Sequence, residues 1–206
     1  MELTHYLTAF VTLFVIVDPI ALAPLFVALT QGMDSVQRRG VALRAALIAI
    51  GLLTLFGLLG EAILSGIGIS MSAFRISGGI LLFLTALDML FERRTQRREG
   101  HHADPHHDPS VFPLATPLIA GPGAFTTMIL LVNEPGTGIG HVVAIHGVMV
   151  LVIACAFILF NAAGLIERAL GRTGILVITR LLGMLLAALS VQFVLDGILG
   201  TGLAGG

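Results

Sequence analysis

The residues LTHYLTAFVTLFVIVDPIALAPLFVAL, numbered 3 to 29, decide the fold class of this chain. The stretch is longer than the roughly 20 apolar residues that cross the hydrocarbon core of a bilayer, and Asp18 is its only Asp, Glu, Lys or Arg. We therefore expect a membrane-spanning helix. No basic segment precedes the stretch and no small-residue cleavage site closely follows it, so we expect it to be retained and not removed as a signal peptide.

The rest of the chain has the same apolar character. Of its 206 residues, 56% are hydrophobic and only 11% are charged, whereas soluble domains are about a quarter charged. Five further apolar stretches follow, at roughly 41–64, 73–91, 111–132, 142–166 and 175–199. The sequence therefore predicts an all-α membrane protein of six transmembrane helices, built as one domain over residues 1–206.

Charge and motifs exclude several classes of function. The net charge of −1 provides no basic surface for nucleic acid, so we expect no such partner. Cys155 is the single cysteine, which excludes thiol-transfer chemistry that needs a cysteine pair. Neither a phosphate-binding GxxxxGK[ST] loop nor a GxSxG motif occurs, so we expect neither an ATP-driven pump nor an enzyme, and no cofactor.

The positions of the arginines predict the orientation in the membrane. They cluster at the first, third and fifth joints between spans: Arg38, Arg39 and Arg44; Arg93, Arg94, Arg97 and Arg98; Arg168 and Arg172. Because Lys and Arg near span ends are retained on the cytoplasmic side, we expect these joints to be cytoplasmic. Both termini then lie outside, as an even number of spans requires.

The two halves of the chain share features that indicate an internal repeat. Prolines recur at the same spacing of five in the first and fourth spans, as Pro19 and Pro24 and then Pro117 and Pro122. The third span opens with RISG from Arg75, and the sixth with RLLG from Arg180. The pattern predicts repeat A at about 1–91, a cytoplasmic loop at about 92–110 and repeat B at about 111–206. Because each repeat has three helices, the second must be inverted relative to the first.

The prolines predict that helices 1 and 4 are broken and that a binding site lies at the breaks. A proline inside a helix leaves carbonyls without hydrogen bonds, which a membrane tolerates only where the segment is buried in protein or lines a wet cavity. Asp18 adds a carboxylate at the first break, and glycines flanking Pro122 offer main-chain N–H groups at the second. The candidate substrate or ion site therefore comprises Asp18, Pro19, Pro24, Gly121, Pro122 and Gly123. The alternative is a pair of kinks sealed by neighbouring helices.

A second set of polar residues lies in the third and sixth spans. Both spans carry a base near the start and an acid near the end, the reverse of what the helix macrodipole favours. We therefore expect charge pairs with a gating role, Arg75 with Asp196 near the outer face and Arg180 with Asp88 near the inner face, with Gln192 as a further polar member. The alternative is that each charge reaches interfacial water separately.

The loop HHADPHHDP, residues 101–109, contains two histidine pairs and two aspartates. Such a composition could bind zinc or nickel. The segment is short and flexible in composition, so we expect no metal site there.

Four strings carry a resemblance to a known family: VDPIALAPLFVALT, FRISGGILLFLTALDML, FPLATPLIAGPGA and ITRLLGMLLAALSVQFVLDGI. They resemble the MarC family of bacterial inner-membrane proteins, whose relatives include SnatA-type neutral amino acid transporters. The resemblance implies a six-helix inverted repeat similar to the LysE superfamily, and it places the family's acidic, proline and GPG positions on the six candidate site residues. Ala21 and Leu22 stand where a Gly-Asn pair is common in the family.

The resemblance and the broken helices together favour a secondary transporter of small neutral amino acids such as glycine and alanine. The expected partners are a small-molecule substrate, the lipid bilayer and a coupling H⁺ or Na⁺; the oligomeric state is left open. The alternatives are a non-transport membrane partner or assembly subunit, and an exporter of an unidentified small solute. A pure scaffold does not need a matched pair of broken helices, which favours transport.

Overall fold

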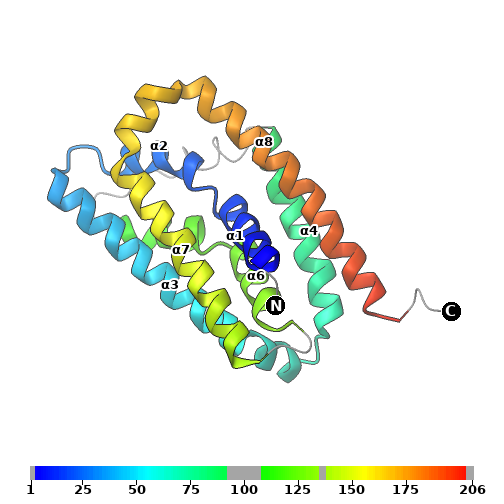
Figure 1. The fold of residues 1–206 in the computed structure, drawn as a ribbon. Coiled ribbons are helices and arrows are strands. Elements are labelled where there is room, and N and C mark those ends of the chain that lie inside the picture. Colours follow the sequence, from blue (N-terminus) through cyan, green and yellow to red (C-terminus); the bar gives the residue numbers. More distant parts are fainter. Residues whose placement is uncertain (1–2, 92–107, 135–137, 203–206) are drawn as a thin grey trace.

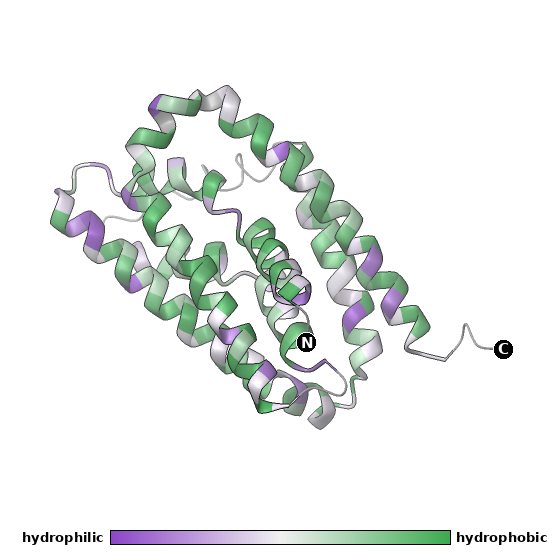
Figure 2. Cartoon of the chain, viewed as in Figure 1, coloured by the Kyte–Doolittle hydropathy of each residue, from purple (hydrophilic) through white to green (hydrophobic). Residues whose placement is uncertain are grey.

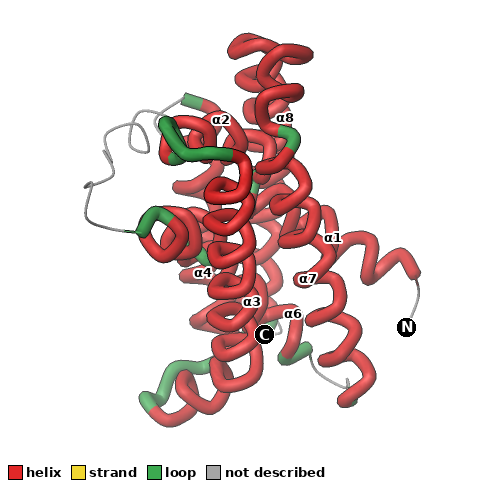
Figure 3. Tube along the Cα trace, turned by 90° about the vertical axis from the view of Figure 1, so that its left-hand side faces the viewer, coloured by secondary structure: helices red, strands yellow, loops and turns green. Residues whose placement is uncertain are grey.

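The computed structural model describes residues 3–91, 108–134 and 138–202, and these contain helices but no strands (Figure 3). The helices in chain order are α1 (Leu3–Val17), α2 (Pro19–Leu29), α3 (Ser35–Gly66), α4 (Met71–Leu90), η1 (Ser110–Ile119), α6 (Pro122–Val132), α7 (Ile139–Asn161) and α8 (Ala163–Leu199) (Figure 1). The predicted all-α architecture is confirmed for this part of the chain.

Five stretches are long and apolar enough to cross a membrane: Leu3–Leu29, Ser35–Gly66, Met71–Leu90, Ile139–Asn161 and Thr173–Leu199. The pair η1 and α6 makes a sixth candidate, bent by 57° at its break. Figure 2 shows that hydrophobic residues predominate along the helices, and Leu47, Leu58 and Leu84 are each more than half exposed. Such a surface requires lipid as its solvent.

Helix α3 begins six residues before the apolar stretch that predicted it, because a capping box fixes its start. Asp34 Oδ1 accepts a hydrogen bond from the Gln37 amide at 2.8 Å, and Gln37 Oε1 accepts one from the Asp34 amide at 3.0 Å. These reciprocal bonds satisfy main-chain donors that the first helical turn leaves open. Arg38 and Arg39 are therefore helical and not part of a loop.

The predicted fifth joint, residues 167–174, is also helical. Ala162 alone separates α7 from α8, and α8 continues through the joint with a kink at Gly171. Gly171 has φ 61°, a left-handed conformation that glycine adopts without the steric cost of a Cβ. The chain at residues 167–174 therefore forms a helix with a kink at Gly171, and not the predicted loop.

Helices α4 and α8 form a close antiparallel pair with glycines at the contact. A Cβ added to Gly79 would lie 2.7 Å from Ser190 O, and one added to Gly197 would lie 2.6 Å from Ile76 Cγ1. Small residues let membrane helices approach this closely. The start of α4 is therefore level with the end of α8.

The broken spans occupy the middle of the bundle. Figure 1 shows α1 and α6 between α3 and α7 on one side and α4 and α8 on the other. Helix α3 packs against η1, α6 and α7, whereas α7 packs against α1 and α2. Helix α4 packs against α6, and α8 against α1 and α2. Each broken span thus lies against the unbroken helices of the other half of the chain.

Candidate functional site

The first span is broken at Asp18, which lies between α1 and α2 in a left-handed conformation with φ 51° and ψ 60°. Its carboxylate Oδ1 accepts a hydrogen bond from the Ala21 amide at 3.3 Å, so Asp18 is the N-cap of α2. The residue is completely buried. Because a helix N-terminus favours negative charge, capping offsets part of the cost of burying this carboxylate.

The fourth span is broken at Gly121, the N-cap of α6. A Cβ there would lie 2.5 Å from Pro117 O, which explains why this residue is glycine. No side chain caps the helix, and the first intrahelical bond runs from the Phe125 amide to Gly121 O at 3.0 Å. The amides of Gly123 and Ala124 precede that bond and are buried. Helix α6 therefore begins with two buried main-chain donors that no side chain caps.

The four prolines do not act as two equivalent pairs. Pro19 and Pro122 both stand at the start of a helix, where the missing N–H would be unsatisfied in any case. Pro24 lies inside α2 and Pro117 inside η1. The expectation that every proline frees a carbonyl is therefore corrected, because Pro19 and Pro122 remove no helical hydrogen bond.

The two breaks lie side by side because α1 and α6 are antiparallel. A Cβ added to Gly123 would lie 3.3 Å from Ile16 Cγ2, and His5 Nε2 lies 3.3 Å from Glu134 Oε2. Between these contacts α1 runs from residue 5 to residue 16, while the antiparallel segment containing α6 runs back from residue 134 to residue 123. Eleven residues of helix rise about 16 Å, roughly half of a 30 Å bilayer core.

Comparison with known proteins identifies the family. Residues 3–201 match the family model described as MarC family integral membrane protein. This chain belongs to the MarC family. The predicted resemblance is confirmed, and the chain is an integral membrane protein. No solved structure matches the fold significantly.

Relatives of this MarC-family chain match over nearly its whole length. A UPF0056 membrane protein of Methanocaldococcus jannaschii is 36% identical, covering 97% of this chain and 98% of its own. The UPF0056 membrane protein YvbG of Bacillus subtilis is 35% identical, covering 100% and 97%. The UPF0056 inner membrane protein YhgN of Escherichia coli K12 is 32% identical, covering 95% and 97%.

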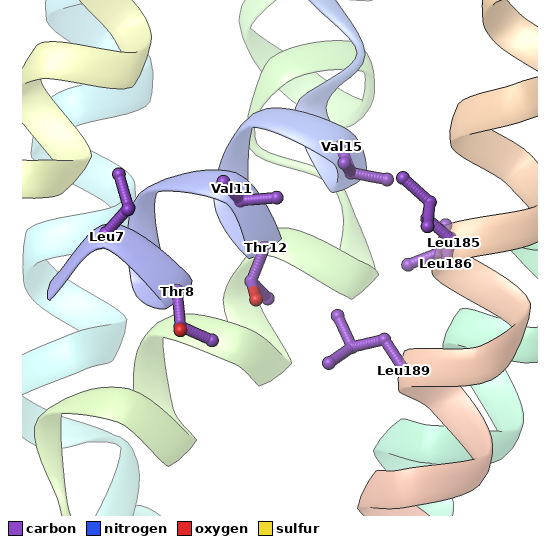
Figure 4. Close-up of a pocket in the computed structure, with 8 residues that line it drawn as sticks. All are labelled: Leu7, Thr8, Val11, Thr12, Val15, Leu185, Leu186 and Leu189. Atoms are coloured by element: carbon purple, nitrogen blue, oxygen red, sulfur yellow. The ribbon is translucent and has the colours of Figure 1, made fainter. Parts of the chain in front are cut away.

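A mainly apolar pocket of about 330 Å³ lies between α1 and α8 of the MarC-family fold (Figure 4). Its lining comprises Leu7, Thr8, Val11, Thr12, Val15, Leu185, Leu186 and Leu189. The volume is at the lower end of the range of small-molecule pockets. Val15 lies about one helical turn before Asp18, so the pocket extends along α1 toward the first break.

The predicted charge pairs lie on α4 and α8. The antiparallel packing of these helices brings Arg75 to the level of the end of α8, and Asp88 toward the level of Arg180. Asp196 accepts a hydrogen bond from Gln192 Nε2 at 2.7 Å. The pairing of Arg75 with Asp196 and of Arg180 with Asp88 stays a prediction.

An ion pair between the first part of α3 and the segment before η1 was missed from the sequence. Arg44 Nη2 on α3 lies 3.2 Å from Asp108 Oδ2, and Asp108 Oδ1 accepts a hydrogen bond from the Ser110 amide at 3.0 Å. Partial burial raises the pKa of Asp108, but hydrogen bonds from Ser110 and the charge of Arg44 outweigh burial and lower the pKa from 3.8. These contacts attach the start of η1 to α3.

The remaining histidine-rich segment, residues 101–107, lies outside the described residues. Sequence reasoning also missed the meeting of His5, Glu134 and His141 at one end of the bundle. Their positions near the ends of spans were visible in the sequence. Their proximity was not, because more than a hundred residues separate His5 from the other two.

Proposed function

We propose that this protein is a secondary transporter of small neutral amino acids of the glycine and alanine type. The observation that most supports this proposal is that Ile16 lies against Gly123. This contact brings the break between α1 and α2 beside the break between η1 and α6, so a single site can include both. Helices α2 and α6 both begin there, so the positive ends of two helix dipoles meet about halfway through the bilayer. An enzymatic role is not part of the proposal.

The chemistry at the breaks suits a small zwitterion. The buried amides of Gly123 and Ala124 can donate to a substrate carboxylate, because no side chain caps α6. The buried Asp18 carboxylate provides negative charge for the substrate ammonium or for a coupling H⁺ or Na⁺. The close contact of Gly123 with Ile16 leaves little space, so bulky side chains should be excluded.

The packing supports a 3+3 inverted repeat. Exchanging α1 and α2 with η1 and α6, α3 with α7, and α4 with α8 maps the main contacts between helices of the two halves onto one another, although the contacts of α7 with α6 and α8 have no equally close counterpart. Packing of α3 on η1 and α6 corresponds to packing of α7 on α1 and α2. In transporters of this plan, one repeat rocks against the other around a central site.

The location proposed for the protein is the bacterial inner membrane, with both termini outside. The relative YhgN, an inner membrane protein, supports the membrane assignment. Arg38, Arg39 and Arg44 all lie in the first part of α3, at the end of the bundle opposite His5, which supports a cytoplasmic position for that end.

Uptake by proteoliposomes tests the proposal. Purified protein should accumulate labelled glycine and alanine above empty vesicles, and unlabelled phenylalanine or lysine should compete poorly. Imposed H⁺ and Na⁺ gradients identify the coupling ion. Absence of uptake for every small neutral amino acid, with protein shown to be folded, would contradict the proposed substrate class.

Asp18→Asn tests the mechanism, because asparagine removes the charge but remains a good helix cap. We expect uptake to be lost or to become independent of the ion gradient. Glu61→Gln is the matched control, since Glu61 is an exposed carboxylate on α3 and should be dispensable. Transport by Asp18→Asn at the parent's rate and ion dependence would reduce Asp18 to a structural cap.

A further inference from the structure

Three metal-ligating side chains meet at the end of the bundle where α1 begins. His5 lies on α1, Glu134 directly follows the C-cap of α6, and His141 lies in the first turn of α7. One ligand atom of each lies within 4.8 Å of the other two. The helices that carry them are packed together, since α1 contacts both α6 and α7.

The hydrogen bonding of His141 prepares one of its ring nitrogens for a ligand. His141 Nε2 lies 2.7 Å from Leu131 O, and a carbonyl can only accept, so Nε2 carries the proton. The lone pair is then on Nδ1, which is buried and has no hydrogen-bond partner. A histidine that donates one N–H to a main-chain carbonyl and presents its other nitrogen is the usual state of a metal ligand.

The positions of His5 and Glu134 match the same interpretation. The 3.3 Å between His5 Nε2 and Glu134 Oε2 is close to the separation of about 3.3 Å between two ligands at 2.0–2.1 Å from a tetrahedral zinc ion. His5 Nε2 nevertheless has no hydrogen-bond partner. The side chains of His5 and Glu134 are about 30% exposed, whereas His141 is only 4% exposed, so the three groups lie at the edge of the bundle and not in its core.

We propose that His5, Glu134 and His141 form a binding site for a divalent transition-metal ion, with Zn²⁺ as the best match. Two imidazoles and one carboxylate are a recurrent zinc ligand set that leaves a fourth position for water or an added ligand. The site is separate from the helix breaks, which lie about 16 Å deeper along α1. The proposal therefore does not depend on amino acid transport.

The decisive measurement is Zn²⁺ titration of the full-length protein, purified without a polyhistidine tag. His101, His102, His106 and His107 are first replaced by Asn, so that the histidine-rich loop cannot contribute. Calorimetry on this parent should give one Zn²⁺ per chain. Co²⁺ in place of Zn²⁺ should give the ligand-field absorption of a site with nitrogen and oxygen ligands, and Zn²⁺ should abolish it.

Variants assign the ligands. His5→Gln, Glu134→Gln and His141→Gln should each weaken Zn²⁺ binding at least about tenfold. His146→Gln is the matched control, because His146 lies on the same helix and also bonds a main-chain oxygen, at 2.7 Å, but is not in the cluster. It should bind Zn²⁺ like the parent.

A thermal shift provides a second readout that does not depend on activity. Zn²⁺ should raise the unfolding temperature of the parent and of His146→Gln but not that of His5→Gln, since a ligand stabilises only the state that binds it. His5→Gln alters only a partly exposed side chain, so this variant still tests Zn²⁺ binding at the site if His141→Gln folds poorly. The proposal is overturned if the parent binds no Zn²⁺, or if His5→Gln and Glu134→Gln bind it as tightly as the parent.

Discussion

At the scale of single residues, Asp18 has a structural role besides the binding role proposed for it. A carboxylate inside an apolar span predicts a functional group, because burying it is costly. The structure adds a local reason for the acid, since Oδ1 caps α2 and the left-handed backbone suits Asp or Asn better than most residues. Substitution by Asn and by Ala therefore separates charge from capping.

We predict that Asp18→Ala unfolds more easily than Asp18→Asn. Alanine loses the cap, worth about 1 kcal/mol, and is strained in the left-handed region by about another 1 kcal/mol, whereas asparagine retains both features. Thermal or denaturant unfolding in detergent measures the difference. Equal stability of the two variants would mean that the bond from the Ala21 amide contributes nothing.

Gly123 is the second residue with a specific steric requirement. A Cβ there would lie 2.9 Å from Leu82 Cδ2 and 3.3 Å from Ile16 Cγ2, so Gly123→Ala should destabilise the protein by about 1–3 kcal/mol. Gly51→Ala is the control, because no atom lies within 4 Å of the added Cβ and alanine favours a helix by about 0.5–1 kcal/mol. Comparable unfolding temperatures for the two variants would contradict the tight contact between the breaks.

At the scale of elements, short-range contacts determine where helices begin and bend, which the pattern of apolar residues does not predict. The capping box at Asp34 sets the start of α3, Gly171 lets α8 continue through an expected loop, and Arg44 attaches the segment before η1. Each of these features changes where a helix begins, bends or is held.

The contact of Asp108 with Arg44 and Ser110 predicts a pH-dependent contribution to stability. The pKa of Asp108 is lower in the folded protein than its ordinary value of 3.8. The contribution of this carboxylate to stability is therefore complete above pH 3.8, and it is lost as the pH falls through the lower pKa of the folded state. The side chains of Arg44 and Asp108 are about half exposed, so their contribution to the free energy of unfolding should be within about 1 kcal/mol and should decrease with added salt.

A double-mutant cycle with Asp108→Asn and Arg44→Gln measures this contribution. Near neutral pH the coupling between the two positions should be stabilising, and at pH 3 or below it should be smaller. A coupling that stays constant from pH 7 to pH 3 would exclude ionisation of Asp108 as its source.

At the scale of the whole molecule, the prediction concerns orientation in the membrane. Replacing Cys155 by Ser and introducing single cysteines at Gly100 or Gly206 gives two reporters for a membrane-impermeant maleimide in intact cells. We expect Gly206→Cys to react and Gly100→Cys to react only after lysis, because the arginine clusters favour a cytoplasmic third joint. The reverse pattern would invert the topology.

Apolar length, a local property, was enough to predict the lipid solvent, the helical class and the approximate spans. That the prolines themselves break helices 1 and 4 stays a prediction. Tertiary packing, in contrast, brings Ile16 against Gly123 and His5 to Glu134 and His141. Such contacts depend on how helices distant in sequence pack together, and apolar periodicity does not encode which faces become neighbours.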